Sequence, residues 1–426
     1  MLGEDDLETF RELGYAVVKG AFAPETAARC ADLVWDAFER EQGMRLQDSS
    51  TWPAVKCSLA QSFGPDCGPP WSEVFTPRLT GAIADICGGE DSTLPFGCGW
   101  WMCTFPPLDA GAQDECTDDD WRVEGAWHVD GHWFTHYPFS AEVGLVAVML
   151  FSDVEPNGGG TAVAERSHID VLQTLCSFGL DGSRNTALAR ATLQAGHRYD
   201  VVELTGRAGD VVLLHPLLLH ARSSNLSRPS LGGAPWRLIA HPSIGLRQPL
   251  DLGGPGPANA EPATAHAESA RTSARSSVLA SVAREAVLAL GPELGPEMLR
   301  LITPERVRAH ALAKALALNE PQAEAAVEAA AELPGASAMR QEHASELYAG
   351  HHSLCHVRFQ DPLPAAPAPK TEPEPEPGPE PGDDSKQDAA GSGSAAPLPA
   401  WEEERRRRER EMDSLVGFHA FKVQRR

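Results

Sequence analysis

The chain has 426 residues, of which 42% are hydrophobic and 23% charged, as in an ordinary soluble globular protein. Its formal net charge of −24 is that of a surface that repels nucleic acid and anionic lipid, so we expect neither as a partner. Nine cysteines without a Cys-X-X-Cys pair favour reduced thiols and a cytoplasmic location. The acidic start lacks the features of a targeting peptide, and no apolar stretch reaches the length of a membrane span.

The first forty residues predict two helices with a short strand between them. Leu7 and Phe10 lie on one face of a helix that ends before Gly14. Residues 15–19 form a run typical of a strand, and Pro24 opens a second helix that continues to about residue 41.

The middle of the chain changes from irregular sequence to strand signals. Residues 42–120 are rich in Pro, Gly and Trp and predict one helix, over 77–87, and one strand, near 100–105. From Trp121 to about Gly245 the signals are those of strands. Short apolar runs bounded by turn residues lie at 142–152, 201–204, 211–215 and 236–243. Such runs predict the buried strands of a β-sandwich or jelly roll.

Composition divides the chain into five parts. Residues 1–249 form the mainly β domain with its N-terminal helices, and residues 250–274 are a linker rich in Gly, Pro, Ala and Ser. The part 275–361 predicts three or four short helices. Helix stops are expected at Gly291, Gly295, Pro304 and Pro321. Residues 362–400 carry a Glu-Pro repeat and are expected to be disordered, and residues 401–426 suit one solvated, charged helix. A protein partner is expected, if at all, through these last two segments.

The first candidate site is the stretch Trp127–Gly131. On a strand, residues i and i+2 point to the same face, so His128 and Asp130 would present an imidazole nitrogen and a carboxylate oxygen to one ion. Two histidines and one carboxylate on one face are the ligands of non-haem iron(II) oxygenases. A lone His-X-Asp triplet also occurs where the two side chains only satisfy each other, so a second histidine is needed from elsewhere.

Other metal sites are compatible with the same histidines. His128, His132 and His136 are spaced by four and would share one side of a helix, but the glycine and aromatic residues between them disfavour a helix. A zinc-protease motif needs Glu directly after the first histidine, where this chain has Val129. Residues 351–356 hold further His and Cys residues without a defined ligand spacing, and we interpret them as structural or incidental.

Two later segments supply the missing groups. A Gly-Asp turn at Gly209 leads into an apolar strand that ends in His215 and His220. One histidine at the end of such a strand is usually a core residue, but two of them, with an upstream His-X-Asp, favour a metal site. Arg237 lies on a short apolar strand and needs an anionic partner, because an unpaired buried guanidinium is costly. That partner is either a structural carboxylate or the distal carboxylate of 2-oxoglutarate.

Four blocks, in this order, resemble the phytanoyl-CoA dioxygenase family. They are Leu7–Lys19, Trp127–Asp130, Asp153–His168 and Gly209–Asn225, and together they span about residues 5–245, a little over half of the chain. In the third block Arg166 replaces the family's glycine. The resemblance implies a double-stranded β-helix (jelly-roll) fold that uses Fe(II), 2-oxoglutarate and O2, with ascorbate as an external reductant.

The resemblance also assigns roles to residues. It implies that His128, Asp130 and His220 are the metal ligands, that Arg237 holds 2-oxoglutarate, and that His215 is not a ligand. The stretch between His220 and Arg237 is longer than the family's, which leaves a second arginine, at position 228, as an alternative clamp. Arg237 is preferred, because an apolar strand follows it.

The implied activity is hydroxylation of a small, apolar organic substrate, with release of succinate and CO2. Asp130 favours hydroxylation over halogenation, because related halogenases have a small residue there. Aromatic residues near the motifs suit an apolar or flat substrate: Trp100, Trp101, Trp127, Trp133, Phe134 and Tyr137. A basic pocket for a CoA thioester is not evident. The alternative is a non-catalytic jelly roll that binds a ligand or partner through its C-terminal helices and tail.

Removal of residues 362–426 is expected to leave 2-oxoglutarate decarboxylation intact, because every motif precedes residue 245 and the removed part has the composition of a disordered tail. Iron content and succinate formation of the truncated and full chains check this. A truncated protein that folds but no longer binds iron would contradict it.

Overall fold

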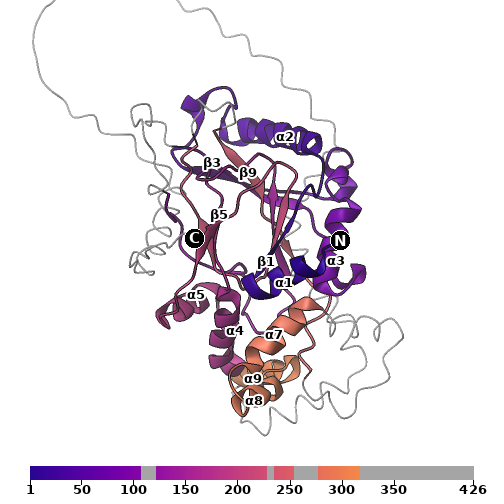
Figure 1. The fold of residues 1–426 in the computed structure, drawn as a ribbon, viewed down its shortest axis with the longest axis vertical. Helices are drawn as coiled ribbons and strands as arrows, with labels where there is room; N and C mark the ends of the chain where they lie inside the picture. Colours follow the sequence, from indigo (N-terminus) through magenta and orange to yellow (C-terminus); the bar gives the residue numbers. More distant parts are fainter. Residues whose placement is uncertain (107–120, 228–234, 254–276, 317–426) are drawn as a thin grey trace, which may run out of the picture. The chain divides into compact units, whose positions relative to one another are not determined.

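The structure is a computed structural model that describes residues 1–106, 121–227, 235–253 and 277–316. Two β-sheets with antiparallel pairing lie at its centre, with helices around them (Figure 1). In spatial order, the larger sheet contains β1 (Tyr15–Val18), β7 (Val211–Leu214), β4 (Leu145–Leu150), β9 (Arg237–Ala240), β3 (Cys98–Thr104) and β2 (Lys56–Phe63), with β10 (Ser243–Ile244) paired to β4. The smaller sheet contains β6 (Val201–Glu203), β5 (Thr161–Ala164) and β8 (His220–Arg222).

Strand β4 is buried on both of its faces. Val146 and Val148 join an apolar cluster that also includes Val163 of β5, so this cluster lies between the two sheets. Leu145 and Met149 belong instead to the large core that includes residues of the surrounding helices. Double burial explains why residues 142–152 form an uninterrupted apolar run rather than an alternating one.

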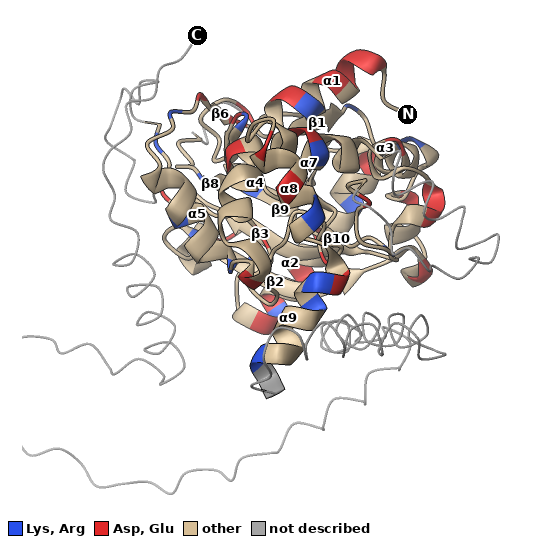
Figure 2. Cartoon of the chain, turned by 90° about the horizontal axis from the view of Figure 1, so that it is seen from below, with Lys and Arg blue, Asp and Glu red and all other residues tan. Residues whose placement is uncertain are grey.

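The N-terminal elements follow the sequence prediction. They are α1 (Glu4–Leu13), β1, α2 (Pro24–Gln42) and α3 (Pro77–Cys87). Gly14 ends α1 with a φ of 90°, and a Cβ there would lie 2.6 Å from Nδ1 of His168, so this position requires glycine. The first turn of α1 contains acidic residues (Figure 2), and they stabilise the helix because they lie at the positive end of its dipole.

Two helices interrupt the region 121–245, for which only strands were expected. They are α4 (Ser167–Ser177) and α5 (Asn185–Gln194). In α4 the buried Leu175 follows the buried Leu172 by three residues and the buried Val171 by four, which is a helical period. The strand-only interpretation of this region was therefore wrong. Strand β2 was also missed, because only alternate side chains of this edge strand are buried.

Three helices follow in the described part of the C-terminal region. They are α7 (Val278–Leu288), α8 (Leu294–Leu301) and α9 (Pro304–Leu316). Gly291 lies between helices, but Gly295 lies inside α8, so the predicted stop at Gly295 was wrong. A Cβ on Gly295 would lie 2.8 Å from Cα of Leu288, so glycine allows α8 to approach α7. Most of the predicted linker 250–274, and everything after residue 316, lies outside the described residues.

Short 3-10 turns complete the described structure. They are η1 (Ser49–Thr51), η2 (Pro65–Cys67), η3 (Trp71–Glu73), η4 (Glu90–Ser92) and η7 (Gly179–Asp181). None of the helices that the structure describes has the length and apolar character needed to cross a membrane.

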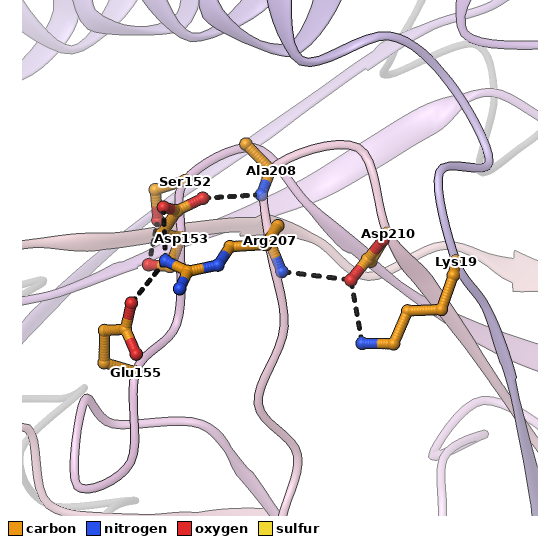
Figure 3. A network of polar contacts seen from close by, with 7 residues as sticks. All are labelled: Lys19, Ser152, Asp153, Glu155, Arg207, Ala208 and Asp210. Atoms are coloured by element: carbon orange, nitrogen blue, oxygen red, sulfur yellow. Dashed lines mark hydrogen bonds and ion pairs between the residues drawn. The ribbon is translucent and has the colours of Figure 1, made fainter.

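A polar network fixes the turn that leads into β7 (Figure 3). Asp210 is buried and accepts hydrogen bonds from Nζ of Lys19 (2.9 Å), the backbone N–H of Gly20 (2.8 Å) and that of Arg207 (3.0 Å). These bonds outweigh the effect of burial and lower the pKa of Asp210. Arg207 in turn contacts the carboxylates of Asp153 and Glu155. The network therefore holds the start of β7, which continues toward His215 and His220.

Candidate metal centre

A backbone bridge places His128 beside His220. The backbone N–H of His128 donates to the carbonyl of His220 (3.1 Å), and that of His220 donates to the carbonyl of His128 (3.0 Å). Residues opposed in this way carry their side chains on the same face, and the two imidazole centroids lie 4.5 Å apart. The bridge is isolated rather than part of a longer strand, so His128 and Asp130 are placed by a local extended segment.

Three ligand atoms converge at this point. Oδ1 of Asp130 lies 3.8 Å from Nε2 of His128 and 3.6 Å from Nε2 of His220, and each residue has a ligand atom within 4.8 Å of those of the other two. Atoms bonded to one ion at about 2.0–2.2 Å can be at most about 4.4 Å apart, so both carboxylate distances allow a shared ion. The structure therefore brings together the three residues that the sequence predicted as ligands.

The second nitrogen of each ring fixes which atom faces the centre. Nδ1 of His128 lies 2.8 Å from the carbonyl oxygen of Ala126, and Nδ1 of His220 lies 2.9 Å from that of Leu218. A carbonyl can only accept, so Nδ1 carries the hydrogen and Nε2 keeps a lone pair for a metal. Nε2 of His220 is buried and has no hydrogen-bond partner among the described residues. A bound ion would satisfy this atom, and two imidazoles with one carboxylate suit iron(II).

Asp130 is held as a carboxylate by its surroundings. Burial alone would raise its pKa, but His241, His220 and His128 outweigh burial and lower it. Oδ2 of Asp130, the oxygen not shared with the two ligand histidines, lies 3.4 Å from Nδ1 of His241. Burial lowers the pKa of His241 to about 4, against the effect of Asp130, so its imidazole is neutral near pH 7. His241 thus lies beside the carboxylate as a neutral side chain.

His241 had no role in the sequence interpretation. The available signal was its position four residues after Arg237, directly after the end of β9. A lone histidine after an apolar strand is more often a core residue, so this signal was not used.

Arg237 points into the space between the sheets. Leu238 lies in the outer core, whereas Ile239, on the same side as Arg237, lies in the cluster between the sheets. Nη2 of Arg237 donates to Oγ1 of Thr161 (2.8 Å), and its Nε atom is buried without a partner among the described residues. Burial lowers the pKa of Arg237 to about 10, although Glu203 nearby acts in the opposite direction.

The nearby carboxylate of Glu203 is already engaged. It accepts hydrogen bonds from the backbone N–H groups of Asn157 (2.7 Å) and Gly160 (2.8 Å). The incomplete hydrogen bonding of Arg237 therefore fits an anion from outside the chain, such as the distal carboxylate of 2-oxoglutarate. Position 228, the alternative clamp, lies outside the described residues.

The other histidines have different surroundings. His215 is buried, and its Nδ1 accepts from the backbone N–H of Leu217 (3.2 Å) while its ring packs against His168. Nε2 of His136 lies 3.1 Å from the carbonyl oxygen of Gly131. Residues 132–134 form a turn rather than a helix, so a three-histidine helical site does not form. The stretch 351–356 lies outside the described residues.

The predicted aromatic residues differ in exposure. Trp101 is fully buried and Trp127 nearly so, whereas Trp100 is 55% and Trp133 36% exposed. Trp101 pairs with Ala240 in the sheet, but the backbone N–H of His241 donates to the carbonyl of Gly99 (2.9 Å), so the register shifts by one residue at Trp100. Trp100 has a φ of 55°, an unfavourable backbone conformation for tryptophan that costs about 1–3 kcal/mol and is found most often at functional sites.

Gly131 allows the chain to turn directly after Asp130. Its φ is 94°, and a Cβ there would overlap the ring of Phe134. Gly131→Ala is expected to displace Asp130 and weaken binding of Mn(II) by about tenfold or more. Gly20→Ala is the matched control, because Gly20 also has a positive φ (54°) but nothing within 4 Å of its Cβ position. Titration followed by electron paramagnetic resonance measures both affinities, and an equal loss in the two variants would contradict this explanation.

No protein-family model matches the chain, and no curated protein matches its sequence. Solved structures do match it. HygX from Streptomyces hygroscopicus, with nickel and 2-oxoglutarate bound, is 14% identical with a TM-score of 0.32, over 57% of this chain and 87% of that chain. SnoN, a non-heme alpha-ketoglutarate-dependent epimerase from nogalamycin biosynthesis, is 18% identical with a TM-score of 0.35, over 57% and 82%. EctD from S. alaskensis is 16% identical with a TM-score of 0.36, over 58% and 78%.

Two of these solved structures, HygX and SnoN, are of proteins that bind or depend on 2-oxoglutarate. The metal centre itself is inferred from the side-chain geometry described above.

Proposed function

We propose that the protein is an iron(II)- and 2-oxoglutarate-dependent oxygenase, built on a double-stranded β-helix, that hydroxylates a small organic substrate. One observation carries the proposal: Nε2 of His128, Nε2 of His220 and Oδ1 of Asp130 converge, while both Nδ1 atoms are tied to backbone carbonyls. Arg237 supports it, because a buried guanidinium with a free Nε suits a dicarboxylate cosubstrate.

Each residue of the site has a distinct task. His128 and His220 would hold the iron as neutral donors, and Asp130 would add one negative charge. Arg237 would bind the distal carboxylate of 2-oxoglutarate and so orient its 2-oxo acid end toward the ligands. Iron(II), when bound with 2-oxoglutarate and O2, supplies the oxidising chemistry that releases succinate and CO2. The burial of His220, Arg237 and His241 excludes water from the cosubstrate side.

The substrate is proposed to be small and to have an apolar or flat face. Trp100 is the observation in favour, because its exposed indole lies on β3, the strand that pairs with β9, and offers such a face. Hydroxylation is the proposed outcome because Asp130 occupies the position that halogenases leave open for chloride. A product that is heavier than its substrate by one oxygen atom would support hydroxylation, and an isomer of the substrate would contradict it.

Succinate formation tests the proposal. The full chain is incubated with 2-oxoglutarate, O2, ascorbate and added iron(II), with and without a chelator. Iron-dependent conversion of 2-oxoglutarate to succinate is expected, even if slow without the substrate. Iron binding at the three ligands without binding of 2-oxoglutarate would favour the alternative, a non-catalytic jelly roll that binds a ligand or a partner.

A further inference from the structure

The two carboxylate oxygens of Asp130 face different partners. Oδ1 lies 3.8 Å from Nε2 of His128 and 3.6 Å from Nε2 of His220, whereas Oδ2 lies 3.4 Å from Nδ1 of His241. Among the residues that the structure describes, no other side chain lies within ion-pair distance of Oδ2. The carboxylate is therefore divided, with one oxygen directed at the candidate metal position and the other at His241.

The backbone on both sides of the His241 imidazole is anchored in the larger sheet. The N–H of His241 donates to the carbonyl of Gly99 in β3 (2.9 Å), and the carbonyl of Pro242 accepts from the N–H of Ala147 in β4 (3.0 Å). The side chain of His241 is only 6% exposed, so the close packing around it restricts its rotation as well. A ring held in this way can restrain the more mobile carboxylate beside it.

The hydrogen of the His241 ring belongs on Nδ1, the nitrogen that faces Asp130. A carboxylate can only accept, and a nitrogen lone pair at 3.4 Å would repel its anionic oxygen. With the hydrogen on Nδ1, the neutral ring is instead a donor to Oδ2. The 3.4 Å separation exceeds the about 2.7–3.2 Å of an ordinary N–H···O bond, so the bond forms after a small shift of either group.

His241 lies outside the set of candidate ligands. In the part of the chain that the structure describes, the ligand atoms within 4.8 Å of one another come from His128, Asp130 and His220. A carboxylate that binds through one oxygen, with two histidines, leaves open three of the about six positions of iron(II), whereas one that binds through both oxygens leaves two. A chelating 2-oxo acid fills two positions, so only the first arrangement keeps a position for a further reactant.

We propose that His241 is a positioning residue, which donates a hydrogen bond to Oδ2 of Asp130 and so keeps this carboxylate on the metal through Oδ1 alone. The inference rests on the proposed function and names a residue that acts on the metal centre through one of its ligands. His241 itself touches neither the metal nor the cosubstrate in this role.

His241→Leu tests the proposal, because leucine fills part of the same space and removes the donor. The full chain is titrated with Mn(II) and followed by electron paramagnetic resonance. The Kd for Mn(II) is expected to rise by about tenfold or more. The spectrum of the bound ion should also change, because the carboxylate is no longer held in one arrangement. His241→Asn, whose amide nitrogen can take the place of Nδ1, should keep the wild-type spectrum and a Kd within about threefold.

His168→Leu is the matched control, because His168 is also buried but its Nε2 contacts the backbone carbonyl of Arg11. It should leave the affinity and the spectrum unchanged. His241→Phe, which keeps a planar ring without a donor, is a second variant with the same expected loss as His241→Leu.

The inference is overturned if His241→Leu and His241→Phe both keep the wild-type affinity and spectrum, or if His241→Asn loses them to the same extent. Addition of 2-oxoglutarate to the Mn(II)-loaded wild type separates this inference from the proposed function. A spectrum that does not respond to 2-oxoglutarate would contradict the proposed function, while a selective effect of His241→Leu on Mn(II) binding would still support the contact with Asp130.

Discussion

Replacing Asp130 with alanine is expected to abolish conversion of 2-oxoglutarate to succinate, by at least about a hundredfold, while the protein stays folded. The variant removes the one negatively charged donor of the three, and the two neutral imidazoles that remain bind iron(II) weakly. The fold should tolerate the change, because the Asp130 side chain is 20% exposed and lies at the site rather than in the apolar core. Succinate formation, iron content and thermal unfolding check the three parts of this prediction.

Asp130→Asn separates charge from shape. It keeps the size of the side chain and removes the charge, so it should lose iron nearly as completely as Asp130→Ala. Asp36→Ala, which removes an exposed carboxylate of α2, is the control for net charge and should be active. Near wild-type consumption of 2-oxoglutarate by Asp130→Ala would show that the ligand assignment is wrong.

Arg237→Gln is expected to raise the apparent KM for 2-oxoglutarate by about ten- to a hundredfold. Loss of a charge-assisted pair typically costs about 1.5–3 kcal/mol, and Gln cannot form the two parallel bonds of a guanidinium. Arg237→Lys should restore only part of the affinity, because an ammonium group keeps the charge but not the planar fork. Initial rates of succinate formation over a range of 2-oxoglutarate concentrations measure the effect.

The control for Arg237 is Gln at position 228, the other arginine that the sequence offers. This variant is expected to have little effect on the KM, because position 228 lies in a Ser- and Gly-rich stretch rather than on the apolar strand. The reverse result, with a large effect at position 228 and none at Arg237, would move the clamp to position 228 and contradict the role given to β9.

The strands and helices with a strong local signal could be predicted from the sequence. The apolar run of β4 and the Pro-to-Gly limits of α3 are examples, because double burial and helix ends leave clear patterns. Strand β2 and helix α4 could not be predicted from the sequence, each for a different reason. The edge strand alternates polar and apolar residues weakly, and the apolar spacing of α4 resembles a strand signal over a short window.

The site was predictable as a set of residues but not as a geometry. His128, Asp130 and His220 stand out by residue type and spacing, whereas their convergence depends on one bridge between segments far apart in the chain. Likewise, the environment of Arg237 depends on the pairing of β9 with β3 and on the approach of β5. His241 gains its significance only from its approach to Asp130, since it lies in no recognisable motif.

A crystal structure of the full chain grown without oxygen, with Mn(II) in place of iron(II) and with 2-oxoglutarate, tests the central claim most directly. The anomalous signal of the metal locates it independently of the protein coordinates. The predicted result is one ion bonded to Nε2 of His128, Nε2 of His220 and a carboxylate oxygen of Asp130, with the distal carboxylate of 2-oxoglutarate against Arg237. An ion bound elsewhere, or 2-oxoglutarate bound away from Arg237, would contradict it.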